Sequence, residues 1–189
     1  AQLGIVDAFC EESFYFKTMR LQMRLAAKQA GLTRLVIEEN FTMADVRENP
    51  HWVFADGDTQ SKMYSITHQK TIRQHGEKIG AGVILMGRRL QENTIPAELY
   101  LKAGTWQCPP LRSWKHEDVW EYMSLFKLTV PEHYFTRLGQ LEGFCDWLIV
   151  PKSAKPSPQQ LVYEIEPEII RELATFHKPT TSWMERNSK

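Results

Sequence analysis

The sequence has few cysteines, no excess charge of either sign and no long hydrophobic run. Its three cysteines, Cys10, Cys108 and Cys145, lie far apart and form no C-x-x-C pair. This spacing argues against a disulfide framework, a zinc knuckle and an iron–sulfur cluster. The histidines also show no H-x-H or H-E-x-x-H spacing, so we expect no metal site. A reducing compartment fits this cysteine usage best, and we therefore expect a cytoplasmic protein.

The charge of the chain is balanced, with 23 basic and 23 acidic residues among 189 and a formal net charge of zero. Such a chain has no long-range field that gathers nucleic acid or an anionic membrane, so any anion must be captured locally. No apolar run approaches the roughly 20 residues that a membrane span needs. The first residues also lack the basic start and apolar block of an export signal. We therefore expect neither a membrane nor a nucleic-acid partner.

Apolar periodicity in the first half of the chain predicts short strands separated by helices. Phe16, Met19 and Met23 recur at helical spacing together with Ala26 and Ala30, and the glycine at position 31 is a typical stop signal. The strands are expected near residues 4–7, 34–37 and 82–86 and the helices near 16–30 and 65–78. A long loop with at most one turn of helix is expected at 42–58.

This order of elements predicts the fold class. Parallel strands need a crossover connection, and crossovers are right-handed, so strand and helix should alternate around one sheet. We expect an α/β fold with three layers, in which helices cover both faces of an open and mainly parallel sheet. This domain should span residues 1–150, followed by a linker at 151–160 and a C-terminal helical extension and tail at 161–189.

The C-terminal extension is expected to contain one amphipathic helix near residues 165–176. Ile169, Ile170 and Leu173 lie at helical spacing and should dock onto the domain. The helix either covers the edge of the sheet or meets a partner, which would be a second copy of the chain or another protein.

The stretch Val83 to Asn93, "VILMGRRLQEN", places a glycine and two arginines directly after an apolar strand. In open parallel sheets, ligands bind outside the carboxyl ends of the strands. Gly87 there would let backbone N–H groups approach an anion, and the guanidinium of Arg88 or Arg89 offers planar donors for phosphate or sulfate oxygens. The alternative is that Gly87 only ends the strand while the arginines pair with Glu92 or with solvent.

A second informative stretch, residues 108–139, contains a helix that follows two prolines. Val119, Tyr122 and Met123 mark one face of that helix together with Phe126. Two tryptophans, at positions 114 and 120, could brace the helix against the sheet, and core packing is the favoured role for both.

Residues 70–139 resemble the phosphoadenosine phosphosulfate reductase family, within the adenine nucleotide alpha hydrolase (PP-loop ATP pyrophosphatase) superfamily. Family members carry a lysine on the helix before the third strand. The motifs G-x-R-x-x-E-S and P-L-x-x-W-T-x-x-D-V-W-x-Y-I follow, and then a tyrosine and a glycine. The matching residues here are Lys70, Gly87, Arg89, Glu92, Pro110, Leu111, Trp114, Asp118, Val119, Trp120, Tyr122, Tyr134 and Gly139, with Asn93 in place of the serine.

The resemblance implies a nucleotide-binding domain in which Lys70 and Arg89 face the phosphate or sulfate end of an adenylyl compound. Gly87, Arg88 and Glu92 would complete this anion site, while Asp7 and Tyr134 would support it. The implied cofactor is an adenine nucleotide, either ATP or an adenylyl sulfate, with or without Mg²⁺. No iron–sulfur cluster is expected.

Two features of the family have no counterpart in this sequence. The phosphate-binding loop S-G-G-x-D-S is absent from the 189 residues, and its expected place lies before Ala1. The domain is therefore expected to be an N-terminally truncated or variant form. The adjacent cysteines that hold a cluster in some members are replaced around Thr67 and His68, and no redox cysteine follows Cys145.

Two functions remain open from the sequence. In the first, the chain is most of an enzyme of the sulfonucleotide reductase or ATP pyrophosphatase kind, a transferase or oxidoreductase of sulfur transfer or adenylylation. In the second, the fold serves as a catalytically degenerate binding or assembly subunit.

Overall fold

The computed structural model describes residues 8–11, 13–32, 35–91, 95–102, 104–130, 132–138 and 146–187. The chain is a mixed α/β protein that divides into two compact units. The first unit combines Ala1–Gln69 with Pro131–Lys189, and the second is Lys70–Val130. Within the ranges described, no helix is both long and apolar enough to cross a membrane.

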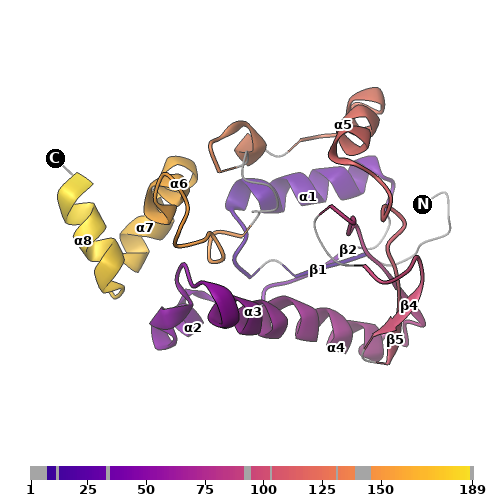
Figure 1. Ribbon diagram of the computed structural model, residues 1–189, viewed down its shortest axis with the longest axis horizontal. Coiled ribbons are helices and arrows are strands. Elements are labelled where there is room, and N and C mark those ends of the chain that lie inside the picture. The colour runs from indigo at the N-terminus through magenta and orange to yellow at the C-terminus, as the bar shows by residue number, and fades with distance from the viewer. Residues whose placement is uncertain are drawn as a thin grey trace. The chain divides into compact units, whose positions relative to one another are not determined.

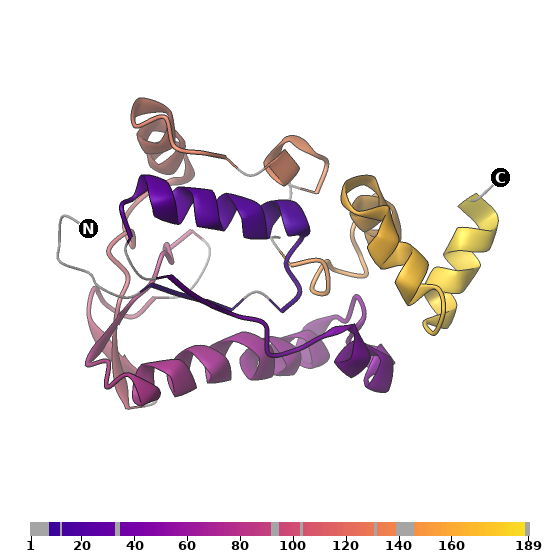
Figure 2. The same ribbon diagram turned by 180° about the vertical axis from the view of Figure 1, so that it is seen from behind.

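The first unit contains a sheet of two parallel strands, β1 (Ala8–Glu11) and β2 (Leu35–Glu38). Helix α1 (Lys17–Gln29) connects them, as the periodicity predicts, and Gly31 ends the connection with a φ of 67°. Helix α1 runs alongside the two strands (Figures 1 and 2). The strand expected at 4–7 lies outside the described residues, and β1 occupies the four positions that follow it.

The buried face of α1 differs in part from the expected one. Ala27 is buried, whereas Ala26 and Ala30 are exposed. Phe16, which immediately precedes the helix, is fully buried, and Met19 packs against the same core. The predicted stripe is therefore buried only at its start, and near the end of the helix Ala27 is buried in place of Ala26 and Ala30.

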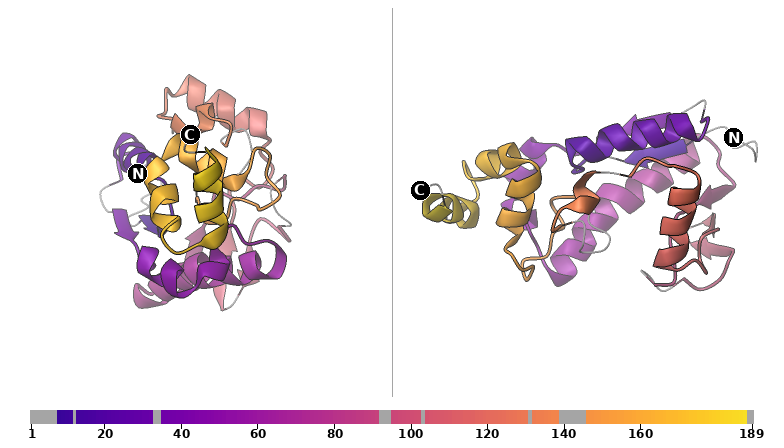
Figure 3. Two further views of the ribbon diagram at one scale, coloured as in Figure 1. Left: turned by 90° about the vertical axis from the view of Figure 1, so that its left-hand side faces the viewer. Right: turned by 90° about the horizontal axis from the view of Figure 1, so that it is seen from above.

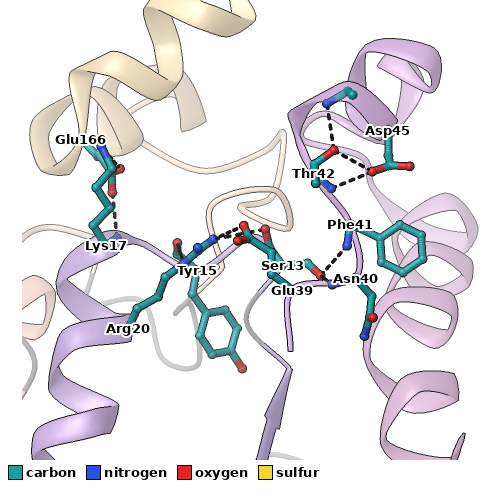
Figure 4. A network of polar contacts seen from close by, with 11 residues as sticks. Ser13, Tyr15, Lys17, Arg20, Glu39, Asn40, Phe41, Thr42, Asp45 and Glu166 are labelled. Atoms are coloured by element: carbon teal, nitrogen blue, oxygen red, sulfur yellow. Dashed lines mark hydrogen bonds and ion pairs between the residues drawn. The ribbon is translucent and has the colours of Figure 1, made fainter. Parts of the chain in front are cut away.

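The expectation of a long loop at 42–58 is wrong, because most of this stretch is helical. The missed signal is a capping box: the Thr42 N–H donates to Asp45 Oδ2 over 2.7 Å, and the Ala44 N–H donates to Thr42 Oγ1 over 3.2 Å (Figure 4). The helical elements of this stretch are α2 (Met43–Glu48), a 3₁₀-helix η1 (Pro50–Trp52) and the start of α3 (Gly57–Tyr64). A π-helical turn η2 (Ser65–Gln69) follows α3.

Three C-terminal helices complete the core of the first unit (Figure 3). The buried positions of Ile169, Ile170 and Leu173 are confirmed. Phe14 and Val46 belong to the same buried cluster, so the two ends of the chain share one core. The helices are α6 (Pro158–Ile165), which begins inside the stretch expected to be a linker, α7 (Pro167–Leu173) and α8 (Lys178–Asn187).

The segment at 146–150 runs through this core without regular secondary structure. Its backbone polar groups find partners on distant parts of the chain. The Trp147 N–H donates to the Phe14 carbonyl over 3.1 Å, and the Leu148 carbonyl accepts from the Phe54 N–H over 3.2 Å. The Ile149 carbonyl accepts from Gln60 Nε2 over 2.7 Å.

Further hydrogen bonds hold the start of α1 and the residues that follow β2 in place (Figure 4). Ser13 Oγ accepts from the consecutive N–H groups of Asn40 and Phe41 over 3.1 and 3.0 Å. At the start of α1, the Lys17 N–H donates to Glu166 Oε2 over 2.9 Å, so a carboxylate from the C-terminal region satisfies one orphan donor of this helix.

The second unit contains a mixed sheet in the order β3-β5-β4. Strands β3 and β5 are parallel, while β4 and β5 form a hairpin whose turn contains Gly104 at a φ of 82°. The expected pairing of three strands in one open, three-layer sheet is not confirmed, because the described strands form two separate sheets. The elements are α4 (Lys70–Lys78), β3 (Val83–Leu85), β4 (Tyr100–Lys102), β5 (Thr105–Cys108) and α5 (His116–Leu125).

The tryptophan motif of the second unit has a local structural explanation. The rings of Trp114 and Tyr122 meet edge to face at 5.4 Å, and the Lys115 N–H donates to Asp118 Oδ2 at the start of α5 over 2.7 Å. Trp120 Nε1 donates to His116 Nε2 over 2.7 Å. Trp120 is only half-buried and lies outside the fully buried core, so the expectation that it anchors that core is corrected.

The capping box of α2 yields a stability prediction. Hydrogen bonds from the backbone and then the side chain of Thr42 hold the pKa of Asp45 below its ordinary value of 3.8. Thr42→Ala should lower the free energy of unfolding by about 1 kcal/mol at neutral pH. Because the pKa of Asp45 is lower in the folded state, its ionised carboxylate stabilises the folded protein at pH values above the ordinary pKa. This stabilisation is lost as the pH falls through the folded-state pKa. The deficit of the variant should therefore shrink in acid.

Chemical denaturation at neutral and acidic pH measures this difference. Thr175→Ala is the matched control, because this exposed threonine bonds only the carbonyl of Glu172, and its effect should stay within about 0.5 kcal/mol. An equal deficit of Thr42→Ala at both pH values would contradict the role assigned to Asp45.

Candidate anion-binding site

The loop at 87–91 leaves the sheet at the carboxyl end of β3. The Met86 N–H donates to the Cys108 carbonyl over 3.0 Å and extends the β3–β5 ladder by one step. Because β3 and β5 are parallel, their carboxyl ends lie at the same edge of the sheet. The loops that follow the two strands therefore start side by side.

Two hydrogen bonds join these two loops at Leu90 and Gln91. The Leu90 N–H donates to the Arg112 carbonyl over 3.0 Å, and the His116 N–H donates to Gln91 Oε1 over 2.8 Å. Arg112 Nη2 also donates a hydrogen bond to the Ile95 carbonyl over 3.3 Å. The backbone of loop 87–91 is therefore fixed by the loop after β5, which is the preorganisation that an anion site needs.

The two arginines of the loop differ in exposure. Arg89 is buried, with 7% of its surface exposed, whereas Arg88 is half-buried. The Arg88 guanidinium makes no hydrogen bond or ion pair with any described residue. Arg88 is therefore the more accessible donor of the pair, a difference that sequence spacing does not reveal.

Gly87 does not have the conformation that usually requires glycine. Its φ lies outside the left-handed region, and a Cβ added there would meet no atom within 4 Å. Neither backbone strain nor packing within the described chain explains a glycine at this position. The open space beside its backbone is compatible with a closely approaching ligand.

The remaining predicted site residues are distributed as follows. Lys70 is the exposed first residue of α4 in the same unit, and its ammonium group forms no hydrogen bond or ion pair with the described residues. Helix α4 packs on β3 through Gly76, which lies beside the Ile84 side chain. Tyr134 lies in the 3₁₀-helix η3 (Glu132–Phe135) of the first unit, and Asp7 and Glu92 lie outside the described residues.

Sequence reasoning missed a buried polar pair in the first unit. His68 Nε2 lies 3.0 Å from Asp146 Oδ2, and both side chains are almost fully buried. The ring of Tyr64 lies 4.8 Å from the His68 ring, and Asp146 Oδ1 accepts from the Leu148 N–H over 2.8 Å. The pair joins the π-helical turn to the buried segment at 146–150.

No pattern in the sequence could have paired two residues that lie 78 positions apart. The π-helical turn is itself a signal of a constrained site, but it is visible only in the structure. Within the described part of the chain, no group of three or more His, Cys, Asp or Glu side chains could hold a metal ion. Cys108 is a free thiol, and Cys145 lies outside the described residues.

Comparison with solved structures shows the fold. The chain is similar to a phosphoadenylyl-sulfate (PAPS) reductase from Candida auris that was crystallised in complex with phosphate. The TM-score is 0.55 at 17% sequence identity, and the match covers 75% of this chain and 70% of that chain. No family model and no curated protein matches the chain. The chain therefore has a PAPS reductase-like fold, which was the family resemblance found in the sequence.

The backbone geometry at Gly87 predicts a contrast between two glycine variants. Gly87→Ala should leave the free energy of unfolding unchanged or raise it by up to about 1 kcal/mol, because alanine fits the conformation and restricts the unfolded chain. Gly80→Ala should lower it by about 1 to 2 kcal/mol, because Gly80 has a φ of 66°. Urea denaturation measures both. A clear loss in Gly87→Ala would show that the fold itself requires this glycine.

The buried pair at His68 and Asp146 predicts a large stability effect. His68→Ala should lower the free energy of unfolding by on the order of 3 kcal/mol, because it removes the imidazole from a buried carboxylate. Arg137→Ala, which removes one partner of the exposed pair with Glu164, should cost less than about 1 kcal/mol. Thermal unfolding of both variants compares them, and equal losses would refute a stabilising role for the buried pair.

Proposed function

We propose that this chain is a nucleotide-binding domain of the PAPS reductase kind, in which loop 87–91 binds the anionic end of an adenine nucleotide or sulfonucleotide. The observation that carries the proposal is the loop itself. Two guanidinium side chains and an uncovered glycine backbone lie at the carboxyl edge of a parallel strand pair, on a backbone held by the neighbouring loop. Fixed positive donors at such an edge suit phosphate and sulfate oxygens.

The proposal extends to the residues around the loop. Lys70 would contribute a point charge from the start of α4, with Glu92, Asp7 and Tyr134 as supporting residues. The crystallised reductase is described as a phosphate complex, which supports an anion as the ligand of this fold. The reaction class would be sulfur transfer or adenylylation with an adenine nucleotide, with or without Mg²⁺, in the cytoplasm. For the fold, we propose the three-layer arrangement in which helices cover both faces of an open sheet.

A binding or assembly subunit is the second candidate. It is favoured by α5 and the residue after it, where Tyr122, Leu125 and Phe126 expose 45%, 76% and 55% of their surfaces. Large exposed apolar side chains that lie close together are typical of surfaces that meet a protein partner. In this alternative, the partner is a second copy of the chain or another protein, also contacted through the C-terminal helices.

The proposal predicts a graded loss of affinity when the loop arginines are replaced. Arg89→Ala should remove a charge-assisted donor worth roughly 1.5 to 3 kcal/mol, which weakens binding by about one to two orders of magnitude. Arg89→Lys should restore only part of the affinity, because an ammonium cannot reproduce the planar fork. Arg88→Ala should weaken binding by a similar factor, with less effect on folding because Arg88 is more exposed.

Calorimetric titration of the full-length protein with ATP and with adenylyl sulfates measures these affinities. Arg73→Ala is the matched control, because Arg73 lies on the exposed face of α4 and pairs with Glu77. Thermal unfolding of each variant separates lost binding from lost folding. Equal affinities in the wild type and both loop variants would place the ligand elsewhere. If the wild type binds no adenylyl compound, the assembly subunit becomes the favoured function.

A further inference from the structure

A series of hydrogen bonds connects loop 87–91 to the start of α5 within the second unit. Gln91 Oε1 accepts from the His116 N–H over 2.8 Å, and His116 is the first residue of α5. The His116 ring accepts at Nε2 from the Trp120 indole N–H over 2.7 Å. His116 is therefore fixed through its backbone to the loop and through its side chain to the next turn of the helix.

The bond at Gln91 gives the loop a third point of attachment. Gln91 is exposed, so this bond rather than burial holds its side chain. It satisfies an N–H group for which the helix itself has no acceptor. The loop is thus held at its start by the β3–β5 ladder, at Leu90 by the Arg112 carbonyl, and at Gln91 by α5. The two loop arginines lie between these points of attachment.

The bond from Trp120 requires one protonation state of the His116 ring. An indole N–H can only donate, so Nε2 must be unprotonated and the proton of the neutral imidazole lies on Nδ1. The two rings also meet edge to face, with their centroids 5.9 Å apart. Protonation of Nε2 would turn a donor toward the indole N–H and break the bond. Histidine changes charge between pH 5 and 8, a range in which arginine stays charged, so this bond is sensitive to pH.

Protonation would also place a cation where other positive charges already lie. The start of a helix carries a partial positive charge. The charged side chains that the described residues of loop 87–91, the loop at 109–115 and the first turn of α5 contribute are Arg88, Arg89, Arg112, Lys115, Glu117 and Asp118. The Asp118 carboxylate already accepts from the Lys115 N–H over 2.7 Å. The helix start and the four cations would therefore repel an imidazolium at His116.

We propose that Gln91 and His116 are positioning residues of loop 87–91, and that protonation of His116 releases the loop. When the ring is neutral, Trp120 holds the first turn of α5, and the His116 N–H holds Gln91. The loop then keeps its two guanidinium groups in place for an anion. This regulation rests on the proposed anion site in loop 87–91, whereas the hydrogen bonds themselves do not require a ligand.

NMR of the full-length protein without ligand tests the hydrogen bonds. The ring nitrogen shifts of His116 should show the proton on Nδ1 at about pH 8, and the Trp120 indole N–H and the Leu90 amide should follow the titration of His116 down to about pH 5. In His116→Gln, the side-chain oxygen can accept from Trp120 but cannot be protonated, so both shifts should stay constant. A Leu90 shift that ignores His116, or that titrates equally in His116→Gln, would overturn the proposal.

Calorimetric titration with adenylyl sulfate measures the consequence for binding, because the acidic groups of this probe stay ionised over the same range. The affinity of the wild type should fall by about three- to tenfold from about pH 8 to about pH 5. His116→Gln should bind within about threefold of the wild type at about pH 8 and keep that affinity in acid. His51→Gln is the matched control, because it removes an exposed histidine of the first unit and should retain the wild-type fall. An equal fall in His116→Gln would contradict the role of this ring.

Gln91→Met tests the other positioning residue, since it keeps the length of the side chain but removes the acceptor. Binding of adenylyl sulfate should weaken by about three- to tenfold with the salt dependence of the wild type, because the arginine charges remain. Arg88→Ala should instead reduce the salt dependence, because it removes a charge. Gln74→Met, on the exposed face of α4, should leave the affinity unchanged. Wild-type affinity in Gln91→Met, or a reduced salt dependence, would refute its positioning role.

The two kinds of readout distinguish this proposal from the proposed function. If the wild type binds no adenylyl sulfate, the proposed function fails, and the shifts of Leu90 and Trp120 decide whether His116 controls the loop. If the wild type binds and the arginine variants lose affinity while pH has no effect, the proposed function stands and the control by His116 is refuted.

Discussion

The first unit depends on the hydrogen bonding of one buried, irregular segment at 146–150. A buried backbone without regular structure must find a partner for each polar group, or it pays the full desolvation cost. Phe14, Phe54 and Gln60 supply backbone and side-chain partners from three directions, and His68 holds the carboxylate at the start of the segment. These bonds join the residues after β1 and the helical stretch at 54–68 to the segment that leads into the C-terminal helices. The same bond that satisfies the Leu148 carbonyl also ties down Phe54, whose φ of 52° is left-handed.

The parts of the fold that sequence reasoning could predict are those with a local periodic signal. Helix α1, strand β2 and the buried face of α7 follow from apolar spacing over one element. The missed elements are short, and their determinants are not apolar. The α2 helix depends on the Thr42 and Asp45 side chains, and the β4–β5 hairpin depends on a turn that contains Gly104. The capping box and this turn were both visible as sequence signals, whereas the division of the strands between two sheets was not, because register between distant strands leaves no local trace.

The candidate site was also predictable from sequence only in part. The loop at 87–91 could be proposed from sequence, since a glycine and two arginines follow one strand directly, and the structure adds how the loop is held. The exposure of Arg88 relative to Arg89 could not be foreseen, because it depends on packing of the loop rather than on spacing.

The proposed site in loop 87–91 illustrates how a chain with no net charge would select an anion. With equal numbers of basic and acidic residues, the chain has little long-range field, so electrostatic steering contributes little to encounter. Selection must then come from donors fixed at short range, where the local dielectric is low and salt screens less. In loop 87–91 these donors are guanidinium groups, which match pairs of oxygen atoms in a plane. A guanidinium therefore selects by the shape of the anion, because its planar donors must face a matching pair of oxygen atoms.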